Sequence, residues 1–134
     1  MKTTITAPLA VFLPRKTMKD KKVIINLNNY RNWSFFMSND VKKAYKEALR
    51  SQLDGLKLAT PIAITFTLWK SQNRLIDRAN PLSIVEKFAC DALTEFGCIP
   101  DDNDEYIYST TYLTGGVDRK NPRVEIIITE INET

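Results

Sequence analysis

Acidic side chains gather in one part of the chain, between residues 77 and 105. Asp77 precedes an expected helix and Asp91 lies on it, while Asp101 and Asp102 follow its end. Clustered carboxylate oxygens can hold Mg²⁺, which favours one or two carboxylates together with water and phosphate oxygens. A solvated acidic turn has the same composition, so the spacing alone leaves both interpretations open. The chain has no histidine, which excludes histidine-assisted nucleophiles and histidine-ligated zinc. Any catalysis must therefore depend on carboxylates, lysine or a metal.

The helix that would carry these groups is clearly marked. Asn80 is a good N-cap, Pro81 suits the first helical position and Gly97 suits the stop. Lys87 and Asp91 stand one turn apart, either as an ordinary ion pair or as catalytic groups. The remaining positions form an apolar stripe that predicts burial, made of Leu82, Val85, Phe88, Ala89, Ala92, Leu93 and Phe96.

The elements around this helix predict a single α+β domain over residues 1–134. Residues 3–13 form a broken strand pattern, and 23–30, 62–69, 106–113 and 123–131 each read as a strand. A second helix is expected from Ser38 to Gly55, with apolar residues at helical spacing. We expect a mixed sheet of about four or five strands with two principal helices packed on it.

Charge is distributed unevenly along the chain. Residues 1–60 hold 12 Lys and Arg against 4 Asp and Glu, whereas residues 61–134 hold 7 against 12. A basic part could bind a polyanion while an acidic part holds a divalent metal. Two solvated faces of opposite sign would give the same counts.

Cysteine content and hydropathy limit the chemistry and the location further. Cys90 and Cys98 are too few for a four-thiolate zinc site, and about 12 Å of helical rise would separate them. We therefore expect two buried free thiols. We also expect no organic cofactor. No apolar run approaches the roughly 18 residues of a membrane span, and Met1 to Thr4 does not open a signal peptide. A cytoplasmic protein that does not enter membranes is expected.

Three short sequence motifs follow one another between residues 77 and 102. They are Asp77-x-x-Asn80, Lys87-x-x-x-Asp91-Ala92-Leu93 and Gly97-x-x-x-Asp101-Asp102. This sequence of blocks resembles the core motif of the RusA family of Holliday-junction resolvases, and residues 125–130 resemble that family's closing strand. The strong match covers residues 75–107; the remainder agrees in length and order of elements. The resemblance implies a small bacterial or prophage endonuclease that requires Mg²⁺, with Mn²⁺ as a possible substitute, and acts as a homodimer.

The resemblance also implies roles for individual residues. Asp77 and Asp102 become candidate metal ligands, Asp91 and Asp101 supporting carboxylates, with Asp91 also a candidate ligand, and Lys87 the catalytic cation. Carboxylate-held metal and a nearby ammonium suit phosphodiester hydrolysis, which needs an activated water and a stabilised leaving oxygen.

The chain departs from the family pattern at two places. The family commonly has a second Asp two residues after the first, where this chain has Ala79, and four extra residues separate Asn80 from Lys87. The insertion would add about one helical turn. Glu86, within that turn, is a substitute candidate ligand.

Contact with DNA would fall to the basic residues of the amino-terminal half. These contacts neutralise phosphates but read no base sequence, so a junction would be recognised by shape. Phe12, Trp33, Phe35 and Phe36 could stack at a crossover or pack in the core. The candidate phosphate contacts are Arg15, Lys16, Lys19, Lys21, Lys22, Arg31, Lys42, Lys43, Lys46 and Arg50.

The sequence thus predicts a Mg²⁺-dependent endodeoxyribonuclease that resolves four-way junctions in recombination and repair. One alternative is a branched-DNA binding protein whose cleavage is weakened or lost because Ala79 replaces a carboxylate. A second is a nuclease acting on flaps or replication forks. A third is a protein-interaction domain, which would bind DNA weakly and without the steep salt dependence of a phosphate-binding protein.

Overall fold

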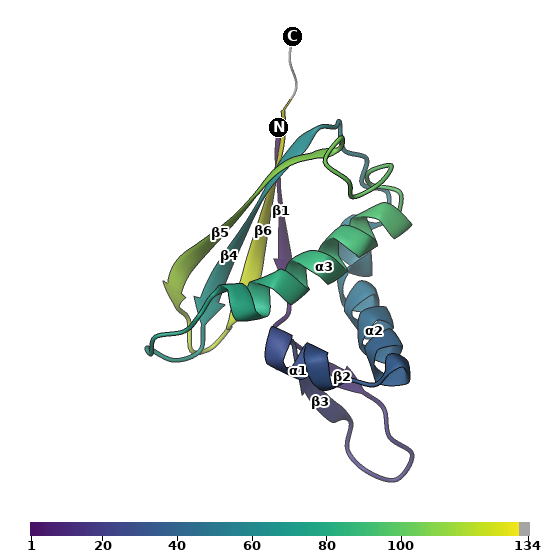
Figure 1. Ribbon diagram of the computed structural model, residues 1–134, viewed down its shortest axis with the longest axis vertical. Helices are drawn as coiled ribbons and strands as arrows, with labels where there is room; N and C mark the ends of the chain where they lie inside the picture. The colour runs from purple at the N-terminus through teal and green to yellow at the C-terminus, as the bar shows by residue number, and fades with distance from the viewer. Residues whose placement is uncertain (132–134) are drawn as a thin grey trace.

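The computed structural model describes residues 1–131 and builds them around a four-stranded sheet (Figure 1). Its strands lie in the order β1–β6–β4–β5, and β2 and β3 form a separate two-stranded hairpin. The α+β prediction is confirmed, with two long helices and one short helix. In chain order the elements are β1 (Lys2–Ala7), β2 (Ala10–Leu13), β3 (Lys21–Ile24), α1 (Leu27–Asn32), α2 (Phe35–Leu53), β4 (Ile62–Lys70), α3 (Ala79–Glu95), β5 (Ile107–Val117) and β6 (Arg123–Glu130).

The sheet is mixed, as predicted. β4 runs parallel to β5 and antiparallel to β6, and Phe66 lies opposite both Tyr112 and Ile126. Parallel neighbours need a long crossover, and α3 supplies it between β4 and β5. This crossover sets α3 beside the edge strand β5.

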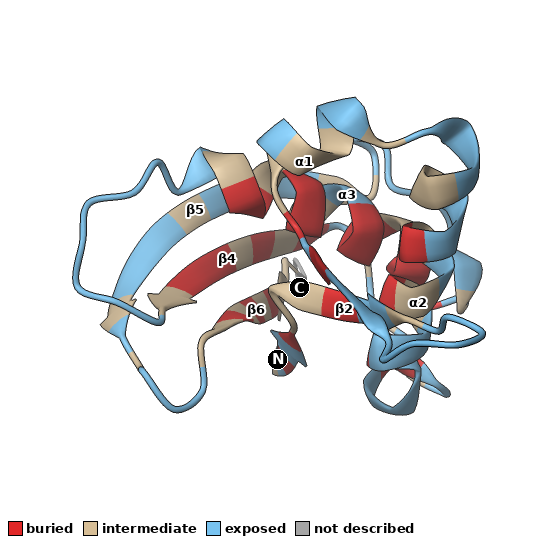
Figure 2. Ribbon diagram, turned by 90° about the horizontal axis from the view of Figure 1, so that it is seen from below, coloured by how far each residue is buried: buried red, intermediate tan, exposed pale blue. Residues whose placement is uncertain are grey.

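The core lies between one face of the sheet and helices α2 and α3. Alternate residues of β4, from Ile62 to Leu68, are buried on that face, as the period-two pattern predicted. Nine residues of α3 are buried, among them Phe88, which contacts the ring of Tyr45 on α2. Figure 2 shows the buried inner strand β4 beside a largely exposed β5.

The C-terminal end of α3 follows the predicted stop signal. Gly97 has φ +76°, a left-handed conformation that costs glycine little. The amide of Gly97 donates to Thr94 O, and the amide of Cys98 donates to Leu93 O at 2.9 Å. Cys90 and Cys98 are both buried and unbridged, which confirms their expected role as free apolar thiols. Within residues 1–131 no helix combines the length and apolar character needed to cross a bilayer.

The strand expected over residues 23–30 is wrong in its second half. β3 ends at Ile24, and α1 begins at Leu27. The Asn26 side chain caps this helix by accepting from the Asn29 amide at 2.7 Å. The asparagines that suggest a turn therefore start a short helix instead.

Two predicted helix starts are also corrected. α2 begins at Phe35, one turn before Ser38, because the Ser34 hydroxyl accepts from the Met37 amide at 3.1 Å. α3 begins at Ala79, so Asn80 and Pro81 lie within its first turn and Asn80 is not its N-cap. The Asn80 side chain instead accepts from the Leu27 amide at 2.8 Å, at the start of α1.

Candidate functional site

One face of α3 looks onto an open cleft of about 450 Å³ beside β5. Positions 83, 86, 87, 90 and 91 share this face because helical neighbours recur every three or four residues. The loop after α3 closes one side, and β5 closes another. The cleft is lined by Ser83, Glu86, Lys87, Cys90, Asp91, Asp102, Asn103, Asp104, Ile107, Thr110 and Tyr112.

Four of the predicted site residues meet in this cleft. They are Glu86, Lys87, Asp91 and Asp102, separated by up to 16 positions in the sequence. The lining therefore combines three predicted carboxylates with one ammonium. Asp104 adds a fourth carboxylate that was not among the predicted residues.

Two predicted site residues do not line the cleft. Asp77 is exposed before α3, where its carboxylate accepts from the Ala79 amide at 3.1 Å. Asp101 is exposed in the following loop and accepts from the Asp102 amide at 2.8 Å and from the Asn103 side chain at 3.0 Å. Both carboxylates stabilise turns in this conformation.

The ion pair considered between Lys87 and Asp91 is wrong. Asp91 is paired with Lys42 of α2, with 2.6 Å between Nζ and the carboxylate. This hydrogen bond to Asp91 raises the pKa of Lys42 above its ordinary value. Lys87 is exposed and has no ion pair among residues 1–131, so its ammonium is free to meet an anion in the cleft.

Glu86 is the most constrained carboxylate of the cleft. It accepts a hydrogen bond from the Tyr112 hydroxyl of β5. Burial and this bond raise the pKa of Tyr112, so the phenol stays protonated as a donor. Burial likewise raises the pKa of Cys90 to about 12, which keeps that thiol protonated and a poor nucleophile at neutral pH.

The cleft offers the right kind of donor for Mg²⁺ but not an assembled site. Carboxylate oxygens of Glu86, Asp91 and Asp102 are hard ligands that suit this ion. Within the described residues, however, no three acidic or cysteine side chains converge closely enough to hold a metal. Tyr112 and Lys42 each contact one oxygen of Glu86 and Asp91, which leaves the other oxygen of each carboxylate available to a metal.

The basic residues divide into two groups. Five cations occupy the β2–β3 hairpin, which projects from the body of the molecule (Figure 1), and Arg31 lies in the last turn of α1. All six are exposed, as is Lys43 on α2. The hairpin cations are Arg15, Lys16, Lys19, Lys21 and Lys22.

The other three predicted DNA contacts are held by the protein itself. Lys42 and Lys46 pair with Asp91 and Glu95, which stand one turn apart on α3. Arg50 pairs with Glu47 at 2.9 Å and lies over the Phe96 ring at 4.8 Å. This series of contacts joins α2 to α3, and each exposed pair contributes about 0–1 kcal/mol.

Sequence reasoning missed several cleft residues, above all Tyr112. Alternation along β5 sets Thr110 and Tyr112 on one face, but nothing in the sequence pairs that face with Glu86. No known family model matches the chain, and no curated protein matches it.

Proposed function

We propose that this protein is a Mg²⁺-dependent endodeoxyribonuclease that acts on branched DNA, with the four-way junction as its substrate. The observation that carries the proposal is the joint placement of Glu86, Lys87, Asp91 and Asp102 around one open cleft. Three sequence blocks first singled out Lys87, Asp91 and Asp102, and Glu86 entered as a substitute ligand.

The cleft residues have separable tasks in this proposal. Bound Mg²⁺ would supply Lewis-acid stabilisation of the phosphate and a more acidic water. Glu86, Asp91 and Asp102 would hold it through their oxygens. The Lys87 ammonium would bind a phosphate oxygen and stabilise charge there as the P–O bond breaks. Lys42 and Tyr112 would orient Asp91 and Glu86 by staying bound to one oxygen of each carboxylate.

Affinity for DNA would come from the exposed hairpin cations and from the exposed Arg31 and Lys43. Phosphate contacts of this kind position the duplex without reading its sequence. A four-way junction has twofold symmetry, so a homodimer would present one cleft to each of two opposed strands. Lys42, Lys46 and Arg50 would contribute only after leaving their acidic partners.

A second candidate is a branched-DNA binding protein with little or no cleavage. Two observations favour it. Ala79 has a methyl group at a position where the family that the sequence blocks resemble commonly has a carboxylate. In addition, the Asp77 carboxylate accepts from the Ala79 amide and lies outside the cleft. Fewer carboxylates around a metal lower the charge and the ligand number that hold it.

Cleavage of an end-labelled synthetic four-way junction tests the proposal. The reactions contain Mg²⁺ or EDTA and are compared with linear duplex of the same sequence. Asp102→Asn is the test variant, because it retains shape but loses a charged ligand. Asp54→Asn is its control, since Asp54 is an exposed carboxylate at the end of α2, away from the cleft lining.

The nuclease proposal expects paired nicks across the junction that require Mg²⁺, that Asp102→Asn loses and that Asp54→Asn retains. Tight junction binding without nicks would replace the first candidate by the second. Absence of junction binding would refute both. Equal cleavage by the Asp102→Asn protein would refute the assignment of the cleft.

A further inference from the structure

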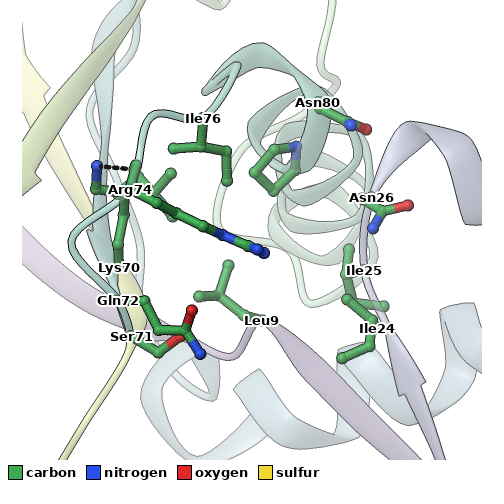
Figure 3. A pocket seen from close by; sticks show the side chains of 12 residues that line it. Leu9, Ile24, Ile25, Asn26, Lys70, Ser71, Gln72, Arg74, Ile76 and Asn80 are labelled. Atoms are coloured by element: carbon green, nitrogen blue, oxygen red, sulfur yellow. Dashed lines mark hydrogen bonds between the residues drawn. The ribbon is translucent and has the colours of Figure 1, made fainter. Parts of the chain in front are cut away.

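A second hollow lies on the other side of the α3 start, and its lining differs in character from the acidic cleft. It measures about 210 Å³ and is bounded by β3, the end of β4 and the loop 71–78. Figure 3 shows the Arg74 side chain extending across it, between Ile76 and Leu9. We infer that this hollow is a binding site for an unpaired DNA strand, with Arg74 as its central contact.

The first supporting observation is that the hollow continues into a larger one. A neighbouring depression of about 690 Å³ shares Leu9, Ile24, Ser71 and Arg74 with it. Because the two hollows share these four residues, we treat them together as the Arg74 groove. It extends along the β2–β3 hairpin to Phe12 and Lys22.

The second observation is the charge of the Arg74 groove. Among residues 1–131, neither hollow has an acidic side chain in its lining, whereas Lys22, Lys70 and Arg74 supply positive charge. The fourth cation, Arg123, is already paired with Asp118 at 2.9 Å and with Glu125 at 3.3 Å. The unneutralised groove therefore suits a polyanion.

The third observation concerns Arg74 itself. Two hydrogen bonds hold the backbone at Arg74: Lys70 Nζ donates to Arg74 O at 2.7 Å, and the Arg74 amide donates to Gln72 O at 3.0 Å. Within residues 1–131 its guanidinium has neither an ion pair nor a hydrogen bond. A planar guanidinium can bind a phosphate through two parallel bonds or stack on a base.

The apolar floor of the groove favours an unpaired strand over a duplex. Ile24 is 45% exposed and Ile76 is 47% exposed, and Phe12 is 58% exposed at the far end. A duplex hides its base faces and would offer this floor only phosphates and sugars. Single strands offer both phosphates and base faces, and binding sites for them combine cations with flat apolar contacts.

The position of the groove connects it to the proposed nuclease site. Asn80 and Pro81 line the groove, and Ser83 and Glu86, on the next part of the same helix, line the cleft. A strand opened at a branch point could lie in the groove while its continuation reaches the cleft. This inference deepens the proposed function and rests on it for the choice of DNA as the ligand.

Fluorescence anisotropy with a fluorescein-labelled oligothymidylate tests the inference, in EDTA so that no strand is cut. A labelled DNA hairpin duplex of equal charge is the comparison ligand. Arg74→Gln is the test variant, since it removes the charge and keeps a polar side chain of similar reach. Lys57→Gln is the matched control, because Lys57 donates to Gly97 O at the opposite end of α3, about 25 Å of helix away.

Arg74→Gln is expected to weaken oligothymidylate binding about tenfold, with a smaller change for the duplex. It should also make the slope of log affinity against log salt concentration less steep, by an amount that corresponds to about one lost phosphate contact. Lys57→Gln should bind both ligands as the parent protein does. Ile76→Ser, at an exposed position of the floor, should also weaken the oligothymidylate selectively.

Unchanged oligothymidylate binding by Arg74→Gln would overturn the inference. An equal loss for strand and duplex would overturn it as well, because the groove would then be a general phosphate surface. Thermal unfolding of each variant separates misfolding from lost contact. If the protein cleaves junctions but Arg74→Gln leaves oligothymidylate binding unchanged, only this inference is refuted. If Arg74→Gln weakens oligothymidylate binding but the protein cleaves no junction, only the proposed nuclease activity is refuted.

Discussion

Asn80 allows a direct test of what holds α1 in place, because its side chain, on α3, accepts hydrogen bonds from the first amides of α1. Its side-chain oxygen accepts from the Leu27 amide at 2.8 Å and from the Asn28 amide at 3.4 Å, which are 53 and 52 positions away. Asn26 satisfies the Asn29 amide of the same helix. Asn80→Ala would therefore leave the start of α1 without its tertiary acceptor.

The expected cost follows from two opposing effects. Leaving the part-buried Leu27 amide without a partner costs about 1–3 kcal/mol, and the longer, exposed bond to Asn28 adds little. Alanine has a higher helix propensity than asparagine, so the substitution also stabilises the first turn of α3 by up to about 0.7 kcal/mol. The free energy of unfolding should thus fall by about 1 kcal/mol.

Equilibrium urea denaturation followed by tryptophan fluorescence measures this change. Trp33 follows α1 and stacks on Phe88 with 6.5 Å between ring centroids, so it also reports local opening. Asn80→Asp keeps an oxygen acceptor and should stay within about 0.5 kcal/mol of the parent protein. Asn39→Ala, at an exposed position of α2, provides the control for helix propensity alone.

The reasoning fails if Asn80→Ala is as stable as the parent protein, or if Asn80→Asp loses as much as Asn80→Ala. Amide hydrogen exchange gives an independent check. The Leu27 amide should exchange faster in Asn80→Ala and at the parent rate in Asn39→Ala. Unchanged exchange at Leu27 would mean that the Asn80 bond does not hold α1.

Two further predictions concern packing and pH. Gly115→Ala should lower the free energy of unfolding by about 1–3 kcal/mol, because the new Cβ would lie 2.7 Å from Trp69 Cε2 and 2.8 Å from Thr67 Cγ2. Thermal unfolding measures this change, with Thr111→Ala, an exposed substitution on the same strand, as the control. Equal melting temperatures of the two variants would refute the prediction. Burial raises the pKa of Tyr45 above its unfolded value of about 10. Its stabilisation should be complete below about pH 10 and decline as the pH rises further, because the unfolded phenol then ionises first. Tyr45→Phe, which loses the bond to Pro8 O, should cost about 1 kcal/mol at neutral pH and show a shallower alkaline decline in urea titrations; an equally steep decline would contradict the assignment.

The fold class and most elements followed from local patterns in the chain. Alternation over residues 62–69 predicted β4, and its alternate residues Ile62, Ile64, Phe66 and Leu68 are buried. The apolar stripe of α3 and the stop at Gly97 were equally readable, since helical period and left-handed glycine are local properties. Grouped carboxylates and Lys87 could be selected as candidate site residues for the same reason.

Capping, by contrast, depended on contacts between distant residues. The chain between Val23 and Tyr30 has strand-like and turn-like residues, yet α1 forms there because Asn26 and Asn80 accept from its first amides. No local pattern specifies an acceptor 53 positions away. The start of α3 shifted for a related reason, as Asn80 turns its side chain to α1 rather than to its own helix.

The candidate site shows the same division between residue type and residue pairing. The acidic cluster and the family resemblance together selected Glu86, Lys87, Asp91 and Asp102, and these residues share a cleft because consecutive helical turns and the following loop face one side. Their partners depend on the packing of α2 and β5 beside α3. This packing pairs Asp91 with Lys42 and lets the Tyr112 hydroxyl donate to Glu86. Sequence thus determined which groups are present, while the packing of separate elements determined which charges meet, because short-range electrostatic contacts depend on distances that the chain order does not contain.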